Sequence, residues 1–235
     1  MDTKTYKNNN IQPKIHYITI ATKPHAILEN IVKRAESQNE TVTILGKEEN
    51  RFIGWQGRGN FGIKLREVYL FLQRPDLLDD DIVLFTDAYD VIYCGNQEQI
   101  AKRYLQMEIP ILFGAEKFCN PDPGRANEYL FRATEFPFLN SGLFIGRAWA
   151  LRECMKDYVY DDNHDDQRFW TNKFFDFPQY ITLDYQNQIF LNSVGIPPSE
   201  ILWNGKHAIY RGKNPQFVHI NGPDKTDLRF FLPKN

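Results

Sequence analysis

The chain has 235 residues, of which 42% are hydrophobic, so it can bury the core of one large domain or two small ones. Its net charge of −2 argues against general nucleic-acid binding, which needs cationic side chains to neutralise phosphates. No apolar run reaches the roughly 18 residues that a membrane-spanning helix needs. We therefore expect a globular domain whose partners are neither nucleic acid nor membrane.

The N-terminal residues 1–13 are polar and lack the apolar centre of a secretory signal. We expect a flexible tail there, followed by a single domain over residues 14–235. The cysteines Cys94, Cys119 and Cys154 show no paired spacing, so the sequence predicts neither a zinc site nor a disulfide framework. These features favour a reducing, intracellular location in the cytoplasm, and they leave the oligomeric state open.

Alternating strand and helix patterns open the domain. The predicted elements are a strand at 16–22, a helix at 26–35 and a strand at 42–45. A loop at 51–62 carries four glycines around Trp55, and it precedes a helix at 65–72 whose apolar residues recur with helical spacing. Lys64 lies in the first turn of that helix, and a cation beside a flexible backbone suits an anionic ligand.

The next strand, residues 82–86, is apolar and ends at two carboxylates, Asp87 and Asp90. Carboxylates at the carboxyl end of a strand in an open α/β sheet lie where ligands bind. Two hard oxygen donors suit Mg²⁺ or Mn²⁺, and such an ion can hold a diphosphate. A simple Asx-type turn is the alternative interpretation.

The remaining pattern continues the alternation and then becomes mixed. We expect helices at 96–107, 149–160 and 165–174, strands at 111–115, 138–145, 181–183 and 217–220, and a Pro-broken loop at 119–125. The first half therefore predicts βαβαβαβ, a parallel sheet with helices on both faces, and the fold class is α/β.

Two further polar clusters interrupt this pattern. Four carboxylates fall within residues 161–167, among them Asp165 and Asp166. They repel one another unless they meet a cation or a hydroxyl-rich ligand, although an acidic helix N-terminus is an equally good interpretation. Asn140 begins a run of small polar residues inside an apolar strand, which indicates either close approach of a ligand or a bulge.

His219 ends the last predicted strand. A histidine in this position is more often a hydrogen-bonded structural residue than a ligand, but added to two aspartates it would shift a site from Mg²⁺ toward Mn²⁺. The amides of Asn221 and Gly222, together with Lys225, could meet phosphate oxygens. The chemistry that fits is sugar transfer from a nucleoside diphosphate, with a cation acting as a Lewis acid on the leaving group.

Eight segments, in order, resemble the glycosyltransferase domain of the procollagen lysyl hydroxylase/glycosyltransferase family, and the resemblance runs from about residue 15 to about residue 233. They are Ile18–Thr22, Lys64 in its glycine-rich setting, Asp87–Ile92, Ala115–Glu116 with Phe118–Cys119, Phe138–Gly142, Asp165–Gln167, Asp184 with Gln188–Phe190, and Val218–His219 with Asn221–Pro223.

The resemblance implies a GT-A fold with a Rossmann-like, mostly parallel sheet, a UDP-sugar donor and Mn²⁺, with Mg²⁺ as the other candidate ion. By position, the family's metal ligands are Asp87, Asp90 and His219, and its residues needed for transfer are Asp165 and Asp166. Thr22 and Tyr89 match residues that hold the uridine, Lys64, Asn221, Gly222 and Lys225 match those around the diphosphate, and we add Asn140 as a donor-binding candidate.

The family's acceptor is hydroxylysine or galactosyl-hydroxylysine of collagen-like repeats. We expect retaining transfer of glucose from UDP-glucose to galactosyl-hydroxylysine of a collagen-like glycopeptide. Galactose transfer to hydroxylysine, transfer to another glycan, and a non-catalytic UDP- or glycan-binding module are the alternatives. Where the family has Trp-Pro-Glu-Trp, this chain has Asn120-Pro121-Asp122-Pro123, so two aromatic surfaces on the expected acceptor side are absent.

Overall fold

A six-stranded sheet in the order β2-β1-β3-β6-β5-β7 forms the centre of the computed structural model, which describes residues 13–54, 60–129 and 134–232. Its strands are β1 (Ile15–Ile20), β2 (Thr43–Leu45), β3 (Ile82–Asp87), β5 (Ile111–Glu116), β6 (Phe138–Arg147) and β7 (Ile181–Leu183). The predicted strands β1, β2, β3 and β5 all run in one direction, and β6 lies between β3 and β5 and runs against them. The prediction of a mostly parallel α/β sheet is confirmed.

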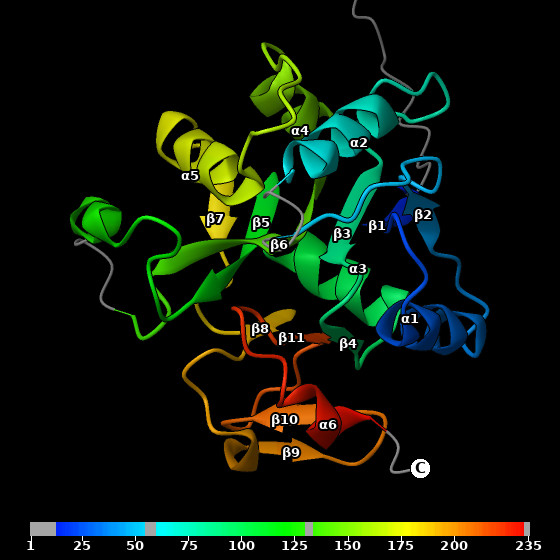
Figure 1. Ribbon diagram of the computed structural model, residues 1–235, viewed down its shortest axis with the longest axis vertical. Helices are drawn as coiled ribbons and strands as arrows, with labels where there is room; N and C mark the ends of the chain where they lie inside the picture. Colours follow the sequence, from blue (N-terminus) through cyan, green and yellow to red (C-terminus); the bar gives the residue numbers. More distant parts are fainter. Residues whose placement is uncertain (1–12, 55–59, 130–133, 233–235) are drawn as a thin grey trace, which may run out of the picture.

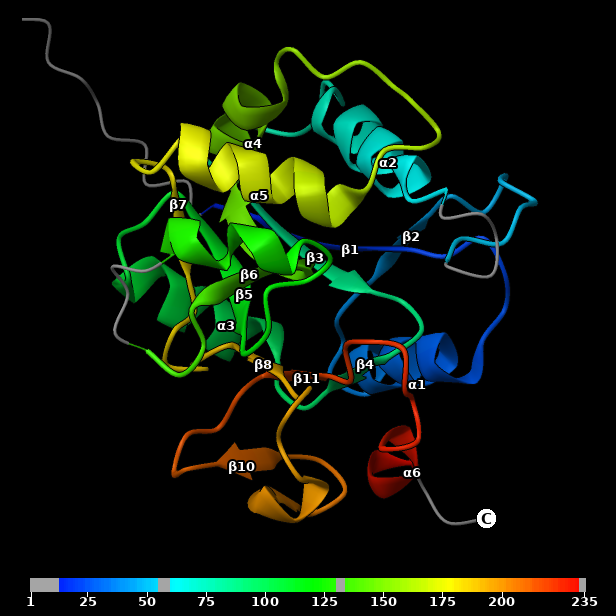
Figure 2. The same cartoon turned by 60° about the vertical axis from the view of Figure 1, so that its left-hand side comes forward.

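Helices cover both faces of this sheet (Figures 1 and 2): α2, α4 and α5 lie on one side, and α1 and α3 on the other. The helices are α1 (Ala26–Glu36), α2 (Gly62–Leu72), α3 (Gln97–Gln106), α4 (Ala148–Met155), α5 (Asp166–Asp176) and α6 (Leu228–Phe231), with 3-10 turns at Pro123–Tyr129 and Pro198–Glu200. Aromatic packing fixes α5 on the sheet, since the ring of Trp170 lies 5.6 Å from that of Phe144.

The prediction for α4 is wrong at its C-terminal end. The helix ends at Met155, whereas the sequence predicted it to continue to residue 160. Val159 is 76% exposed, so the apolar residues that extended the predicted pattern do not face the core. The chain instead turns toward the start of α5.

A second, three-stranded sheet lies beside the central one, in the order β4-β11-β8 (Figure 2). Its strands are β4 (Val91–Tyr93), β8 (Phe190–Asn192) and β11 (Phe217–His219), and a separate hairpin pairs β9 (Ile201–Trp203) with β10 (Ala208–Tyr210). Of these, only β11 was predicted from the sequence. Because β4 follows Asp90 directly and β11 ends at His219, the small sheet brings these two residues together.

Two predictions lie wholly or partly outside the described residues: most of the tail at 1–13, and the part of the glycine-rich loop that contains Trp55. Within the described residues, no helix is long and apolar enough to cross a bilayer. Cys94, Cys119 and Cys154 are free thiols.

Candidate functional site

Asp87, Asp90 and His219 converge at the carboxyl end of β3. Asp87 is its last residue, Asp90 lies just before β4, and His219 ends β11. One ligand atom from each of the three falls within 4.8 Å of the others. The His219 Nε2 atom lies 3.3 Å from Asp90 Oδ2 and 3.8 Å from Asp87 Oδ2. The structure therefore brings together the three residues that the sequence put forward as metal ligands.

Gly142 on β6 makes room for this group. A Cβ atom at Gly142 would lie 2.4 Å from His219 Cε1 and 2.7 Å from Asp87 Oδ2. The β5–β6 ladder is irregular here, because its register steps from Phe113–Phe144 to Gly114–Asn140. The structure thus supports the bulge as the interpretation of the small polar run. Two side chains of the protein approach the backbone at Gly142, and the approach of a ligand stays a prediction. Two carboxylates and one imidazole form a donor set that suits a divalent ion such as Mn²⁺.

Lys64 joins the metal-ligand candidates to α5. Its ammonium lies 2.7 Å from Asp87 Oδ1 and 2.7 Å from Asp166 Oδ2. Burial opposes the charge on Lys64, but the carboxylates of Asp166 and Asp87 outweigh that cost and raise its pKa. The pKa of Asp87 is raised by its own burial. Lys64 therefore remains a cation, and its charge reaches both acidic groups.

Lys225 plays the corresponding part for Asp90. Its ammonium lies 2.5 Å from Asp90 Oδ2 and 2.7 Å from the carbonyl oxygen of Ile220. Burial disfavours the ionised carboxylate of Asp90, but His219 and Lys225 hold its pKa below the usual range. Each aspartate of the Asp-x-x-Asp pair thus has its own lysine partner.

The four carboxylates at 161–167 have different positions. Asp165 caps α5 by accepting a hydrogen bond from the Arg168 backbone N–H at 2.9 Å. Asp162 pairs with the exposed side chain of Arg51. Asp166 alone of the four contacts the lysine beside the metal-ligand candidates, and it also accepts a 2.8 Å hydrogen bond from the Ser141 hydroxyl.

A buried glutamate connects the two asparagines of the candidate set. Glu116, the last residue of β5, accepts hydrogen bonds from Asn140 at 3.0 Å and from Asn221 at 2.8 Å. Burial raises the pKa of Glu116 to about 8, against the effect of these two bonds. The sequence did not put forward Glu116 as a site residue, although it ends a buried strand in the same way as Asp87. The two amides therefore organise the site internally, and Gly222 follows Asn221 with a positive φ of 81°.

Tyr89 holds the loop after β1. Its hydroxyl accepts hydrogen bonds from the backbone N–H groups of Thr22 at 2.9 Å and Lys23 at 3.1 Å. The Thr22 hydroxyl is buried without a hydrogen-bond partner among the described residues. A buried, unpaired hydroxyl is costly in a closed protein, so a polar ligand atom is a suitable partner for it.

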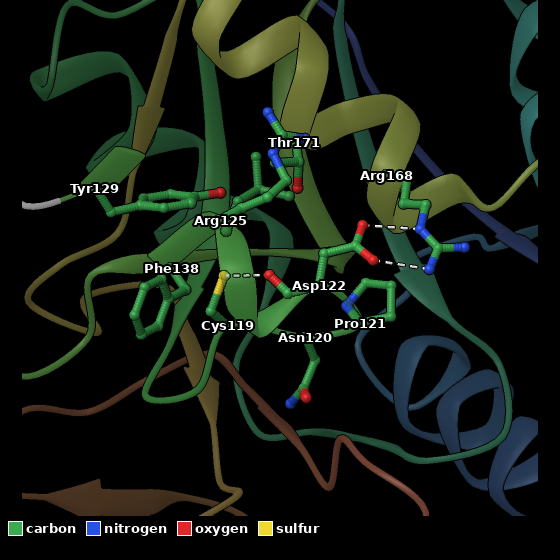
Figure 3. Close-up of a pocket in the computed structure, with 10 residues that line it drawn as sticks. Cys119, Asn120, Pro121, Asp122, Arg125, Tyr129, Phe138, Arg168 and Thr171 are labelled. Carbon is green, nitrogen blue, oxygen red and sulfur yellow. Dashed lines mark hydrogen bonds and ion pairs between the residues drawn. The ribbon is translucent and has the colours of Figure 1, made fainter. Parts of the chain in front are cut away.

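The loop after β5, on the expected acceptor side, is tied to α5 (Figure 3). Asp122 receives two hydrogen bonds of 2.8 Å from the Arg168 guanidinium, and the Cys119 thiol contacts the carbonyl oxygen of Asp122. Asn120 points away from this cluster. The chain thus has a polar loop here that is anchored to the helix carrying Asp166.

The α/β architecture is that of the GT-A glycosyltransferases. A solved glycosyltransferase involved in glycosylation of the major capsid of PBCV-1 aligns over 92% of this chain and 98% of its own, with a TM-score of 0.50 and 12% identity. Mouse xyloside xylosyltransferase 1 aligns over 88% of this chain and 98% of its own, with a TM-score of 0.50 and 11% identity. At these identities the likeness establishes the fold alone.

The family follows from sequence. The chain belongs to the family described as the PLOD GT domain, whose model matches residues 11–232. The human multifunctional procollagen lysine hydroxylase and glycosyltransferase LH3 is 32% identical over 92% of this chain and 31% of its own length. Human procollagen-lysine,2-oxoglutarate 5-dioxygenase 2 is 31% identical over 93% of this chain and 31% of its own. The chain thus spans about a third of the length of these curated relatives.

Proposed function

We propose that the chain is a metal-dependent transferase that moves glucose from UDP-glucose to galactosyl-hydroxylysine of a collagen-like glycopeptide. The observation that carries this proposal is the group of Asp87, Asp90 and His219, whose ligand atoms lie within 4.8 Å of one another at the carboxyl end of β3. Family membership supports the transferase class. The choice of UDP-glucose as donor and galactosyl-hydroxylysine as acceptor goes beyond the family and is part of the proposal.

The residues at the site fit a divalent ion, with Mn²⁺ favoured over Mg²⁺ because an imidazole joins the two carboxylates. Asp87, Asp90 and His219 would hold the ion, and the missing side chain at Gly142 leaves space beside them. When bound, the ion supplies a Lewis acid that stabilises the charge on the diphosphate leaving group. Because the fold already holds the three ligand atoms close together, the side chains would need little rearrangement to bind the ion.

The two lysines would add to the positive charge that the ion presents to the diphosphate. Lys64 and Lys225 each lie against a carboxylate of the pair, and they hold positive charge close to where the diphosphate would sit. Asn221 and Gly222 follow the end of β11 after one intervening residue and would border the phosphates through their backbone N–H groups.

The uridine and the sugar would lie on opposite sides of the metal ligands. Tyr89 and the unpaired hydroxyl of Thr22 belong to the β1 side and are assigned to the uridine. Asp166 and Asn140 belong to the β6–α5 side and are assigned to the donor sugar or the acceptor hydroxyl, with Asp165 supporting Asp166 through the start of α5.

UDP release tests the proposal. The full chain is incubated with MnCl₂ and, separately, with UDP-glucose and UDP-galactose, each without an acceptor, with a hydroxylysine peptide and with a galactosyl-hydroxylysine peptide. We expect peptide-dependent release from UDP-glucose. Release from UDP-galactose with a hydroxylysine peptide would select the galactosyltransferase alternative, whereas UDP binding without turnover on any acceptor would select the non-catalytic module.

A further inference from the structure

Asn192 lies behind the histidine of the proposed metal site and was not put forward by the sequence. It is the last residue of β8, it is fully buried, and it is paired with His219 in the parallel β8–β11 ladder. We propose that Asn192 is a positioning residue that holds the His219 ring in the tautomer able to bind a divalent cation. This inference rests on the proposed function for the identity of the ion.

The orientation of the Asn192 amide follows from its two contacts. Its Nδ2 group donates to the carbonyl oxygen of Ala115 at 3.0 Å, and its Oδ1 atom lies 2.9 Å from His219 Nδ1. The reverse orientation would place two oxygens against each other at Ala115 and two potential donors against each other at the histidine. The Oδ1 atom therefore faces the ring as an acceptor, and Nδ1 must carry the proton.

The backbone around Asn192 is shaped to seat this amide. A Cβ atom at Gly114 would lie 2.7 Å from Asn192 Nδ2, so only glycine leaves that space open. The register of the β5–β6 ladder shifts at the same residue. The irregular end of β5 thus provides both the gap for the amide and the carbonyl that orients it.

The ring nitrogen that faces the carboxylates is Nε2, and the hydrogen bond at Nδ1 determines that Nε2 carries the lone pair. A neutral imidazole has one proton, and only the other nitrogen can bind a metal. Nε2 lies 3.3 Å from Asp90 Oδ2 and 3.8 Å from Asp87 Oδ2, and both atoms would otherwise attract a proton to Nε2. An acceptor at Nδ1 favours the proton on the far side of the ring and leaves Nε2 free for the ion.

Two substitutions separate this role from a structural one. Asn192→Leu keeps the volume but removes the acceptor, and we expect it to weaken Mn²⁺ binding by about 10- to 100-fold, the usual cost of losing an outer-shell partner. Asn192→Asp keeps an acceptor at Nδ1, so its Mn²⁺ affinity should stay close to that of the wild type. The preference for Mn²⁺ over Mg²⁺ should fall only in Asn192→Leu, because only there does the imidazole contribute less.

The order of thermal stability of the two variants should be the reverse of the order of their Mn²⁺ affinities. A buried carboxylate facing the Ala115 carbonyl is less favourable than an apolar side chain, so Asn192→Asp should melt below Asn192→Leu. A merely structural asparagine predicts that metal affinity falls together with the melting temperature. A positioning asparagine predicts that the more stable variant is the weaker metal binder.

Ser193 provides a matched control. It is the next residue, it is buried, and its hydroxyl contacts the backbone carbonyl of His219 at 3.1 Å rather than the ring. Ser193→Ala therefore removes a hydrogen bond to the same histidine without touching the tautomer. We expect its Mn²⁺ affinity and metal preference to match those of the wild type.

The measurement is a titration of the full chain with MnCl₂, alone and with UDP, followed by electron paramagnetic resonance of free Mn²⁺. Equal affinity of wild type and Asn192→Leu overturns the positioning role and leaves the proposed function standing. No Mn²⁺ binding by the wild type in either arm overturns both. If Asn192→Leu does not fold, Asn192→Asp decides: wild-type affinity despite a lower melting temperature supports the role, and a parallel loss of both contradicts it.

Discussion

Two acidic segments of this chain look similar in sequence and differ in structure. Residues 87–90 and residues 161–166 both place carboxylates next to the end of a secondary-structure element. In the first segment, both aspartates face a common point with His219 and have lysine partners. In the second, Asp162 pairs with Arg51 at the surface, Asp165 caps α5, and Asp166 is connected to the site through Lys64.

Burial explains the difference. The side chain of Asp162 is 36% exposed and needs no ligand, because water and Arg51 satisfy it. The side chain of Asp166 is 8% exposed, and its charge is matched by Lys64. Density of acidic residues in a sequence is therefore a weak sign of a site, and convergence of buried acids on fixed cations is a stronger one.

The largest expected effect comes from the first segment. Asp87→Ala, Asp90→Ala and His219→Ala should each lower the transfer rate by at least about 100-fold, because a Lewis acid contributes several kcal/mol at about 1.4 kcal/mol per decade. Chelation should abolish wild-type activity, and MnCl₂ should restore it. If correctly folded variants keep near-normal transfer rates without added metal, the first acidic segment is not a metal site and its contrast with the second is wrong.

Asp166→Asn should have the next largest effect and should act after donor binding. Its carboxylate contacts Lys64 and Ser141 rather than the metal-ligand side chains, so turnover should fall by about 10- to 100-fold through misplacement of the reacting groups. UDP affinity in calorimetry should stay almost unchanged. A large loss of UDP binding would instead assign Asp166 to the nucleotide.

Tyr89→Ala should weaken UDP binding by about 5- to 150-fold, on the scale of ~1–3 kcal/mol for base–aromatic stacking. A stacking role alone predicts that Tyr89→Phe lowers UDP affinity only slightly, because phenylalanine keeps the face of the ring. The hydroxyl, however, accepts two backbone hydrogen bonds from the loop that carries Thr22, so we expect a smaller but measurable loss of UDP affinity in Tyr89→Phe.

Tyr160, which immediately precedes the second segment, serves as the control for Tyr89. Its hydroxyl donates to Asp162 at the surface, at 2.6 Å, so Tyr160→Phe should leave UDP affinity unchanged. Should Tyr89→Ala melt well below the wild type yet bind UDP normally once folded, Tyr89 belongs to the core and the stacking assignment is wrong.

The smallest effects are expected at the remaining acids of the second segment. Asp165→Ala should lower stability by about 1 kcal/mol through loss of the α5 cap, and Asp165→Asn should restore most of that loss because asparagine caps equally well. Thermal denaturation measures both. If Asp165→Asn is fully stable but inactive, the charge itself is needed for transfer and the capping role is not sufficient.

Much of the main sheet was predictable because its strands carry local signals. The run at 82–86 is apolar and ends in two aspartates, and the structure confirms a strand that ends at Asp87. The position of β6 between β3 and β5 was not predictable, since no local pattern specifies which strands pair across a long connection. Strands β4 and β8 were also missed, because each forms by pairing with β11, which lies far away in the chain.

The same limit applies to the site. Asp87 and Asp90 could be put forward because they lie at the end of an apolar strand, and His219 because the family resemblance pointed to it. Asn192 could not, since its role depends on pairing with a strand whose facing residue lies 27 positions later in the chain. Sequence patterns thus indicate the candidate ligands, and only the tertiary fold identifies the residues that orient them.

The most direct test of the central claim is pulsed electron paramagnetic resonance of Mn²⁺ added to the wild-type chain with UDP. The proposed site predicts that one bound ion is coupled both to a nitrogen nucleus, from the imidazole of His219, and to the phosphorus nuclei of UDP. The nitrogen coupling should disappear in His219→Ala and persist in Asp162→Asn. Bound Mn²⁺ coupled to phosphorus but to no histidine nitrogen would contradict the assignment of Asp87, Asp90 and His219 as the metal site.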